Sequence, residues 1–189
     1  MRYVILSLLL LVASMGLAIT IYDIQYTNTP GVDNTYPSPY VGKAVSIEGI
    51  VTAIDFKGGA YFISEPVAGP WRGIMVSDRR NSPSIGDKIQ ISGVVRETFG
   101  MTCIQDISSF RVIDTNLPLP QPITVTTAQL NRADEAEAYE GVFIRVLSTT
   151  CAQINAARNR FYVTDGTGQC QVKTSEFGNR SIPLAVKVG

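Results

Sequence analysis

Five short apolar runs follow one another between Val45 and Val112, and the first reads Val45-Ser-Ile-Glu-Gly-Ile-Val-Thr-Ala53. The second and third read Gly59-Ala-Tyr-Phe-Ile-Ser-Glu65 and Arg72-Gly-Ile-Met-Val-Ser-Asp78. The fourth reads Ile85-Gly-Asp-Lys-Ile-Gln-Ile-Ser-Gly-Val-Val-Arg-Glu97, and the fifth extends from Thr102 to Val112. Short runs of this kind, separated by turn residues, predict β-strands.

Glycine interrupts two of the predicted strands where a small barrel has to bend. Val45 and Ile47 share one face of the first strand, and Gly49 follows them. Gly93 has the same place in the fourth strand. A glycine inside a strand often marks a bulge or a tight bend. We therefore expect an all-β fold in which residues 19–116 form a five-stranded barrel of the OB type.

Other segments lie before and after this barrel. Polar and apolar residues alternate from Ile19 to Gln25, which predicts one short strand followed by a surface loop. Residues 117–126 are rich in proline and predict an extended linker at a domain boundary. Beyond the linker, Thr127 is expected to cap a short helix that extends to Glu137.

The strand pattern then begins again. Tyr139-Glu-Gly-Val-Phe-Ile-Arg-Val146 matches Tyr40-Val-Gly-Lys-Ala-Val-Ser-Ile47 in spacing, and a hairpin with an Asp-Gly turn is predicted from Phe161 to Lys173. Residues 127–189 are therefore expected to form a second OB-like repeat, truncated after its third strand. On this interpretation a downstream domain is missing from the chain. The alternative is a small, complete β subdomain packed on the first barrel.

The first 18 residues have the composition of a signal peptide. Arg2 supplies a positive start, an apolar run covers Val4 to Val12, and small residues precede a cleavage point after Ala18. The apolar run is short for a membrane span, so we expect cleavage rather than a stable membrane anchor. The mature chain is expected to be secreted or periplasmic.

The amino-acid composition argues against catalysis, and the charge balance bears on nucleic-acid binding. Sixteen basic residues balance sixteen acidic residues, and the chain contains no histidine. A Ser-His-Asp or Cys-His arrangement is therefore excluded, as is a Cys/His zinc site. We expect no enzyme activity, no metal and no cofactor. The neutral balance also gives no bulk electrostatic attraction toward nucleic acid.

Three cysteines are present, Cys103, Cys151 and Cys170. In an oxidising compartment Cys151 and Cys170 are candidates for a disulfide, which leaves Cys103 over. The alternative is that all three are small buried apolar residues.

A candidate ligand surface lies where OB barrels bind, across the second and third strands and the loops beside them. Tyr61 and Phe62 are neighbours in one strand, so only one of them faces outward; Met75 lies on the third strand. Aromatic rings there would stack on bases or sugars, and cations would meet phosphates. The candidate nucleic-acid-binding residues are Lys57, Tyr61, Trp71, Arg72, Arg79, Arg80, Arg96 and Phe99.

An ordered series of short motifs resembles the OB-like domain found near the N-terminus of secreted bacterial nucleases and phosphoesterases and in other exported multidomain proteins. The motifs are Ile21-Tyr-Asp-Ile-Gln25, Ser38-Pro-Tyr-Val-Gly42, Gly49-Ile-Val-Thr-Ala53, Tyr61-Phe-Ile-Ser-Glu-Pro66, Gly73-Ile-Met-Val76 and Ile85-Gly-Asp-Lys-Ile-Gln-Ile-Ser-Gly93. In such nucleases a separate domain cleaves the substrate, so the resemblance implies an accessory module.

The sequence therefore predicts an exported, non-catalytic binding module that assists a larger protein. Single-stranded nucleic acid is the first expected partner. A carbohydrate or cell-surface adhesion module on the same barrel is the alternative, and a structural spacer is the third hypothesis.

Overall fold

The structure is a computed structural model that describes residues 19–32, 35–55, 59–173 and 187–188. The predicted signal peptide lies outside the described residues, and so does Lys57. Within the described part of the chain, no helix has the length and apolar character that a membrane span requires.

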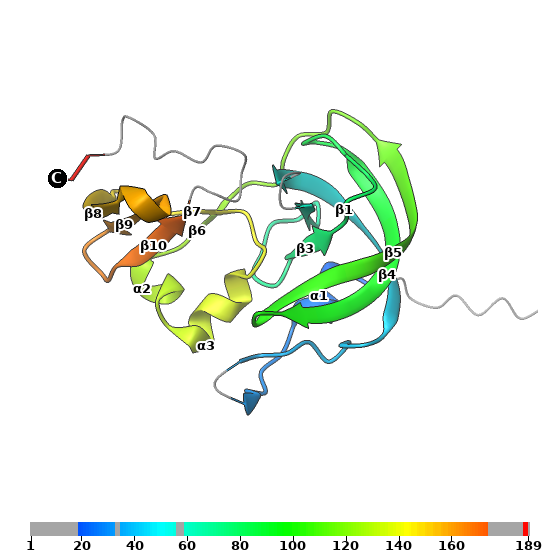
Figure 1. The fold of residues 1–189 in the computed structure, drawn as a ribbon, viewed down its shortest axis with the longest axis horizontal. Coiled ribbons are helices and arrows are strands. Elements are labelled where there is room, and N and C mark those ends of the chain that lie inside the picture. The colour runs from blue at the N-terminus through cyan, green and yellow to red at the C-terminus, as the bar shows by residue number, and fades with distance from the viewer. Residues whose placement is uncertain (1–18, 33–34, 56–58, 174–186, 189) are drawn as a thin grey trace, which may run out of the picture.

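The five strands expected between residues 45 and 112 are all present, and the chain is predominantly β as predicted (Figure 1). They are β1 (Ala44–Asp55), β2 (Ala60–Ser64), β3 (Gly73–Ser77), β4 (Lys88–Thr98) and β5 (Met101–Asp114). They close into a barrel in the order β1-β2-β3-β5-β4. All neighbours are antiparallel except β3 and β5, which run parallel.

The two strand glycines lie where the backbone passes close to neighbouring atoms. A Cβ added at Gly93 would lie 2.7 Å from the carbonyl oxygen of Gln105, and the β4–β5 register shifts between Ser92 and Val94. A Cβ at Gly49 would lie 3.0 Å from the Cβ of Ile63. Gly93 therefore lies at a bulge of the β4–β5 pairing, as its position in the sequence predicted, and Gly49 leaves room for the Ile63 side chain.

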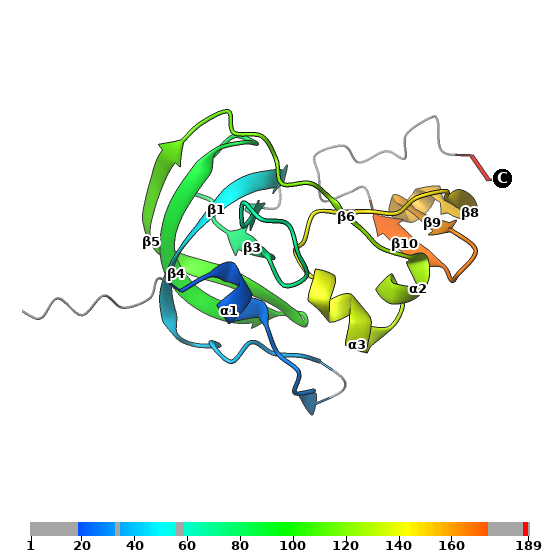
Figure 2. The ribbon, with the colours of Figure 1, turned by 180° about the vertical axis from the view of Figure 1, so that it is seen from behind.

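The segment predicted as a strand before the barrel is a helix, α1 (Ile21–Gln25), so that prediction was wrong. Thr20 caps it, and Asp23 completes a capping box with the Thr20 backbone N–H. Ile21 and Ile24 are three residues apart, which places both on one helix face, and both are fully buried in the barrel core. The helix packs against β1 and β3 (Figure 2).

A second unit follows the proline-rich segment (Figures 1 and 2). Its elements are β6 (Ile123–Thr124), α2 (Thr127–Leu130), α3 (Ala133–Ala136), η2 (Glu137–Tyr139), β7 (Ile144–Arg145), β8 (Thr150–Asn155), η3 (Ala156–Arg158), β9 (Arg160–Thr164) and β10 (Cys170–Lys173). β6 and β7 form a parallel pair, and β8, β9 and β10 form an antiparallel sheet with β9 in the middle.

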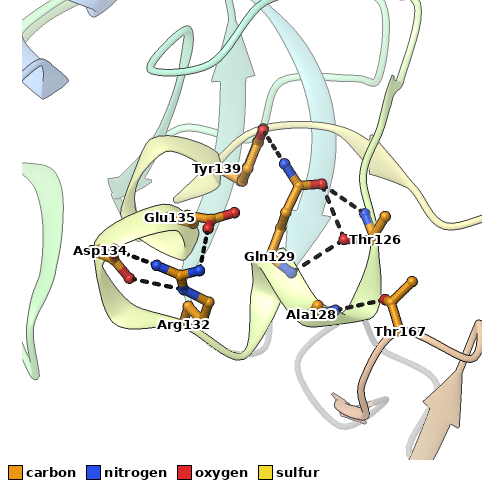
Figure 3. A network of polar contacts seen from close by, with 8 residues as sticks. All are labelled: Thr126, Ala128, Gln129, Arg132, Asp134, Glu135, Tyr139 and Thr167. Atoms are coloured by element: carbon orange, nitrogen blue, oxygen red, sulfur yellow. Dashed lines mark hydrogen bonds and ion pairs between the residues drawn. The ribbon is translucent and has the colours of Figure 1, made fainter.

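The helix expected from Thr127 to Glu137 is divided into short turns, and its cap is Thr126. The Gln129 side chain accepts hydrogen bonds from both the backbone and the hydroxyl of Thr126 (Figure 3). The helix ends at Leu130, after which Arg132 forms ion pairs with acidic residues of α3. Thr127 instead donates its hydroxyl to Asp165 at 2.6 Å.

Each unit has a turn of the same kind ahead of its strands, within the two stretches whose spacing matches in the sequence. The Lys43 N–H donates to the Tyr40 carbonyl at 2.9 Å, and the Val142 N–H donates to the Tyr139 carbonyl at 3.1 Å. Gly42 has φ +80° and Gly141 has φ +65°. Both turns thus need a residue that adopts positive φ without strain.

The strands after these turns share an irregularity. The β1–β2 register shifts between Val51 and Ala53. The β8–β9 register shifts between Cys151 and Gln153. In each unit the third strand then pairs antiparallel with the second.

A carboxylate holds the start of the helix in both units. Glu65 directly follows β2 and accepts a hydrogen bond from the Tyr22 N–H of α1 at 2.8 Å. Asp165 directly follows β9 and accepts one from the Thr127 N–H of α2 at 3.1 Å. Acidic groups at a helix N-terminus bind otherwise unpaired N–H donors.

The predicted disulfide between Cys151 and Cys170 is wrong for this fold. Both cysteines have Val163 as their cross-strand partner, on opposite sides of β9. Two strand spacings of about 4.7–4.9 Å separate them, which exceeds the roughly 7 Å limit between the Cα atoms of a disulfide. All three cysteines are free, and Cys103 is buried.

We expect Ile24→Ala to lower the free energy of unfolding by about 2–5 kcal/mol, because it leaves a cavity in the barrel core. Urea unfolding followed by circular dichroism measures this loss. Val32→Ala is the control, since Val32 is 81% exposed. Equal stability of the two variants would show that α1 does not belong to the core.

We expect three reactive thiols per chain when the protein is purified without reductant and then unfolded, because the sheet keeps Cys151 and Cys170 apart. A colorimetric thiol titration in denaturant counts them. A count of one thiol would contradict the strand order β8-β9-β10.

Candidate binding site

A groove of about 500 Å³ lies where the N-terminal part of α1 meets β1, β4 and the β2–β3 loop. Ligand pockets in proteins commonly have this size. The exposed surface of the groove is mostly apolar, and polar side chains reach it from the N-cap of α1, from β1, from β4 and from the β2–β3 loop. The lining residues are Ile19, Thr20, Ile21, Ser46, Ile47, Glu48, Glu65, Pro66, Val67, Arg72 and Gln90.

An ion pair forms one wall of this groove. Arg72 Nη1 contacts Glu65 Oε2, and the Glu65 side chain is only 12% exposed. The other carboxylate oxygen of Glu65 accepts the Tyr22 N–H of α1. The Arg72 guanidinium also lies over the Tyr22 ring, 5.1 Å from its centroid. These contacts fix Arg72 in one position although it is partly exposed.

Three aromatic rings continue from Arg72, and we call Tyr22, Tyr26 and Trp71 the aromatic shelf. Tyr22 and Tyr26 are stacked with centroids 5.3 Å apart. Tyr26 meets Trp71 edge to face at 5.7 Å. Trp71 has φ +67°, which is strained for a non-glycine residue, and its N–H donates to the Ala138 carbonyl at 2.6 Å. Tyr26 is 44% exposed, so the shelf is open to solvent.

The charges around the groove balance. Glu48 forms an ion pair with Lys88 at 2.9 Å and accepts a hydrogen bond from Gln90. Arg72 and Glu65 form the other pair. The groove therefore presents hydrogen-bonding groups without an excess of positive charge.

Tyr61 is not part of any surface, so its prediction as a ligand-binding residue was wrong. Its ring is fully buried, and its hydroxyl donates to Asp78 at 3.2 Å. Burial and the nearby Asp78 charge raise the pKa of the Tyr61 phenol. Burial alone would raise the pKa of Asp78, but hydrogen bonds from Asn81, Arg80 and Tyr61 lower it. The Tyr61–Phe62 alternation placed Tyr61 inward.

The other candidate residues are not brought together in one site. Arg96 forms an ion pair with Asp106 at 3.0 Å, and Arg80 donates to the backbone carbonyl of Ile107. Arg79 lies against Gly59. Phe99 is fully exposed at the turn between β4 and β5. Of these candidates only Arg72 lines the groove, and Trp71 belongs to the aromatic shelf beside it.

The expected ligand face on β2 and β3 is covered by the chain itself. Residues 141–144 and the β1–β2 residues Thr52, Ala53 and Phe62 line a space of about 270 Å³. A Cβ at Gly73 would overlap the backbone of Gly141. Figure 1 shows the yellow segment after α3 passing between the barrel and the three-stranded sheet. Sequence reasoning missed this contact, because no local pattern records which distant segment lies on a strand.

Among the described residues, no group of three or more His, Cys, Asp or Glu side chains could hold a metal ion.

Comparison with known proteins gives little beyond this description. No family model matches the chain, and no curated protein matches it. One similar solved structure is the hypothetical protein ygiW from E. coli, at 20% identity and a TM-score of 0.30. The match covers 39% of this chain and 77% of that one, and it supports no assignment.

Proposed function

We propose that this protein is an exported, non-catalytic binding module on an OB-like barrel, and that its groove binds a neutral carbohydrate chain. The strand order β1-β2-β3-β5-β4, closed by a parallel β3–β5 pair, supports the OB-like barrel. Barrels of this type bind oligosaccharides as well as oligonucleotides. The composition of residues 1–18 supports export.

The observation that carries this proposal is the aromatic shelf beside a charge-balanced groove. Aromatic rings offer flat apolar faces against which the C–H face of a sugar packs. Ser46, Glu48 and Gln90 line the same groove and supply acceptors and donors for hydroxyl groups. A neutral polyol needs both features and gains nothing from unpaired cations.

Phosphate binding has less support. Affinity for nucleic acid depends on cations that neutralise phosphates. Arg72 and Arg96 are each ion-paired to a carboxylate, and Arg80 binds a backbone carbonyl. Nucleic acid is the second candidate because Phe99 projects fully exposed from the β4–β5 turn, beside the face that OB barrels use.

We also propose that residues 127–173, the main described part of the predicted repeat, are a partial copy of the helix, turn and first three strands of the barrel. The shared turn, the shared register shift and the carboxylate at each helix start support this repeat. The proline-rich residues 117–126 then link the two copies.

We expect the protein to bind at least one member of a panel of soluble neutral oligosaccharides, measured by isothermal titration calorimetry. Tyr26→Ala should weaken that binding by a factor of about 2 to 12, since an aromatic contact contributes roughly 0.5–1.5 kcal/mol. Arg72→Gln should weaken it as well. Phe99→Ala is the matched control and should bind as the unmodified protein does. Affinity should change little with salt, because the ligand is uncharged.

A labelled single-stranded oligonucleotide, titrated over the same salt series, tests the second candidate. If only the oligonucleotide binds, if its affinity falls with salt, and if Phe99→Ala abolishes it, then carbohydrate binding is refuted.

A further inference from the structure

Residues 137–144 hold the second unit against the barrel, and we call them the cover. The Trp71 N–H of the barrel donates to Ala138 at 2.6 Å. The Thr102 N–H at the start of β5 donates to the Glu140 carboxylate at 2.7 Å. Gly73 lies directly against Gly141. Two barrel segments, residues 71–73 and the start of β5, thus bind the cover through hydrogen bonds or close backbone packing.

Three carboxyl groups meet in this contact. The Thr102 hydroxyl donates to Glu97 of β4 at 2.6 Å, while its N–H donates to Glu140. Thr102 therefore joins a carboxyl group of the barrel to one of the cover. Glu137 lies close enough to Glu97 for their charges to interact. Like charges held together out of water repel each other strongly.

The neighbouring groups do not cancel this repulsion. Gln25 of α1 donates to the Glu140 carbonyl at 3.4 Å, and a neutral amide carries no balancing charge. Ser38 donates its N–H to Glu97. Arg96, next to Glu97 in β4, is ion-paired to Asp106. The carboxyl groups of Glu97 and Glu140 therefore accept hydrogen bonds from neutral donors, Ser38 before β1 and Thr102 in β5.

Burial raises the pKa of Glu140 to about 8, and the charges of Glu137 and Glu97 add to this effect, while the Thr102 N–H and Gln25 oppose it. Burial, followed by the charge of Glu97, raises the pKa of Glu137 to about 7. Near neutral pH both groups thus lie within reach of titration while the cover is bound.

We propose that the cover is a pH-dependent latch, which lies on the β2–β3 face while Glu137 and Glu140 are protonated and leaves it as these two groups ionise. Release would expose Phe62 and Met75 on the face that OB-like barrels use for ligands. This inference does not depend on the ligand of the groove.

The direction of the pH effect follows from the difference in glutamate pKa between the bound and the released cover. A released glutamate has a pKa near 4.5, so below that pH both states are protonated and the cover is held fully. Between pH 4.5 and the pKa of the bound state, each carboxyl group weakens the contact by up to about tenfold per pH unit. Above about pH 8 both states are ionised, and no further change is expected from these groups.

The experiment uses the full chain and two signals between pH 5.5 and 8.5. Trp71 is the only tryptophan, so acrylamide quenching of its fluorescence reports the cover contact. Hydrogen exchange of the Trp71 and Thr102 amides, corrected for intrinsic rates, reports the two bonds directly. We expect quenching to rise and protection of both amides to fall at least tenfold, while amides inside β4 keep their protection.

Matched variants separate the latch from general effects. Glu140→Gln should remove most of the pH dependence, and Glu137→Gln should remove part of it, because an amide does not ionise. Glu135→Gln is the control, since Glu135 is ion-paired to Arg132 at the surface (Figure 3). Gly73→Ala should release the cover even at pH 5.5, because its Cβ would overlap Gly141.

Three results would overturn the latch. One is fluorescence and exchange that do not change over this pH range in the unmodified protein. Another is unchanged pH dependence in both glutamine variants. The third is loss of β4 protection in parallel with the Trp71 and Thr102 amides, which would mean that the barrel itself unfolds.

Discussion

The parallel pairing of β3 with β5 is the contact on which the rest of this structure depends. It consists of two residue pairs, Met75 with Cys103 and Val76 with Ile104. Without it β3 would be an open edge and the five strands an unclosed sheet. With it, Val76 and Ile104 are both fully buried.

One short helix connects this core to the candidate binding site. α1 places Ile21 and Ile24 inside the barrel, and Tyr22 on a different face of the helix lies under the Arg72 guanidinium. The position of the arginine is thus linked to the packing of α1 in the barrel core. Glu65 strengthens this link, because a single carboxylate binds both the helix N–H and the guanidinium. The site is held both by the hydrophobic core under α1 and by the contacts among Tyr22, Glu65 and Arg72.

The sequence predicted the barrel well because its signals are local. Alternating apolar residues, the two strand glycines and the repeated turn before Lys43 and Val142 all act within a few residues. The helix at Ile21 was missed because a five-residue segment satisfies both a helical and an alternating pattern. Tyr61 and Phe62 could be told apart only once the inward face was known. The cover was missed because its contacts join residues far apart in the chain.

Trp71 belongs to both the aromatic shelf and the cover contact. Its backbone is held in a left-handed conformation that costs of order 1–3 kcal/mol, and its N–H binds Ala138. A molecule that binds the indole ring therefore contacts the same residue that donates a hydrogen bond to the Ala138 carbonyl. Where such a molecule changes the strength of the Trp71–Ala138 bond, thermodynamic reciprocity requires that proton uptake by the cover change its binding by the same free energy.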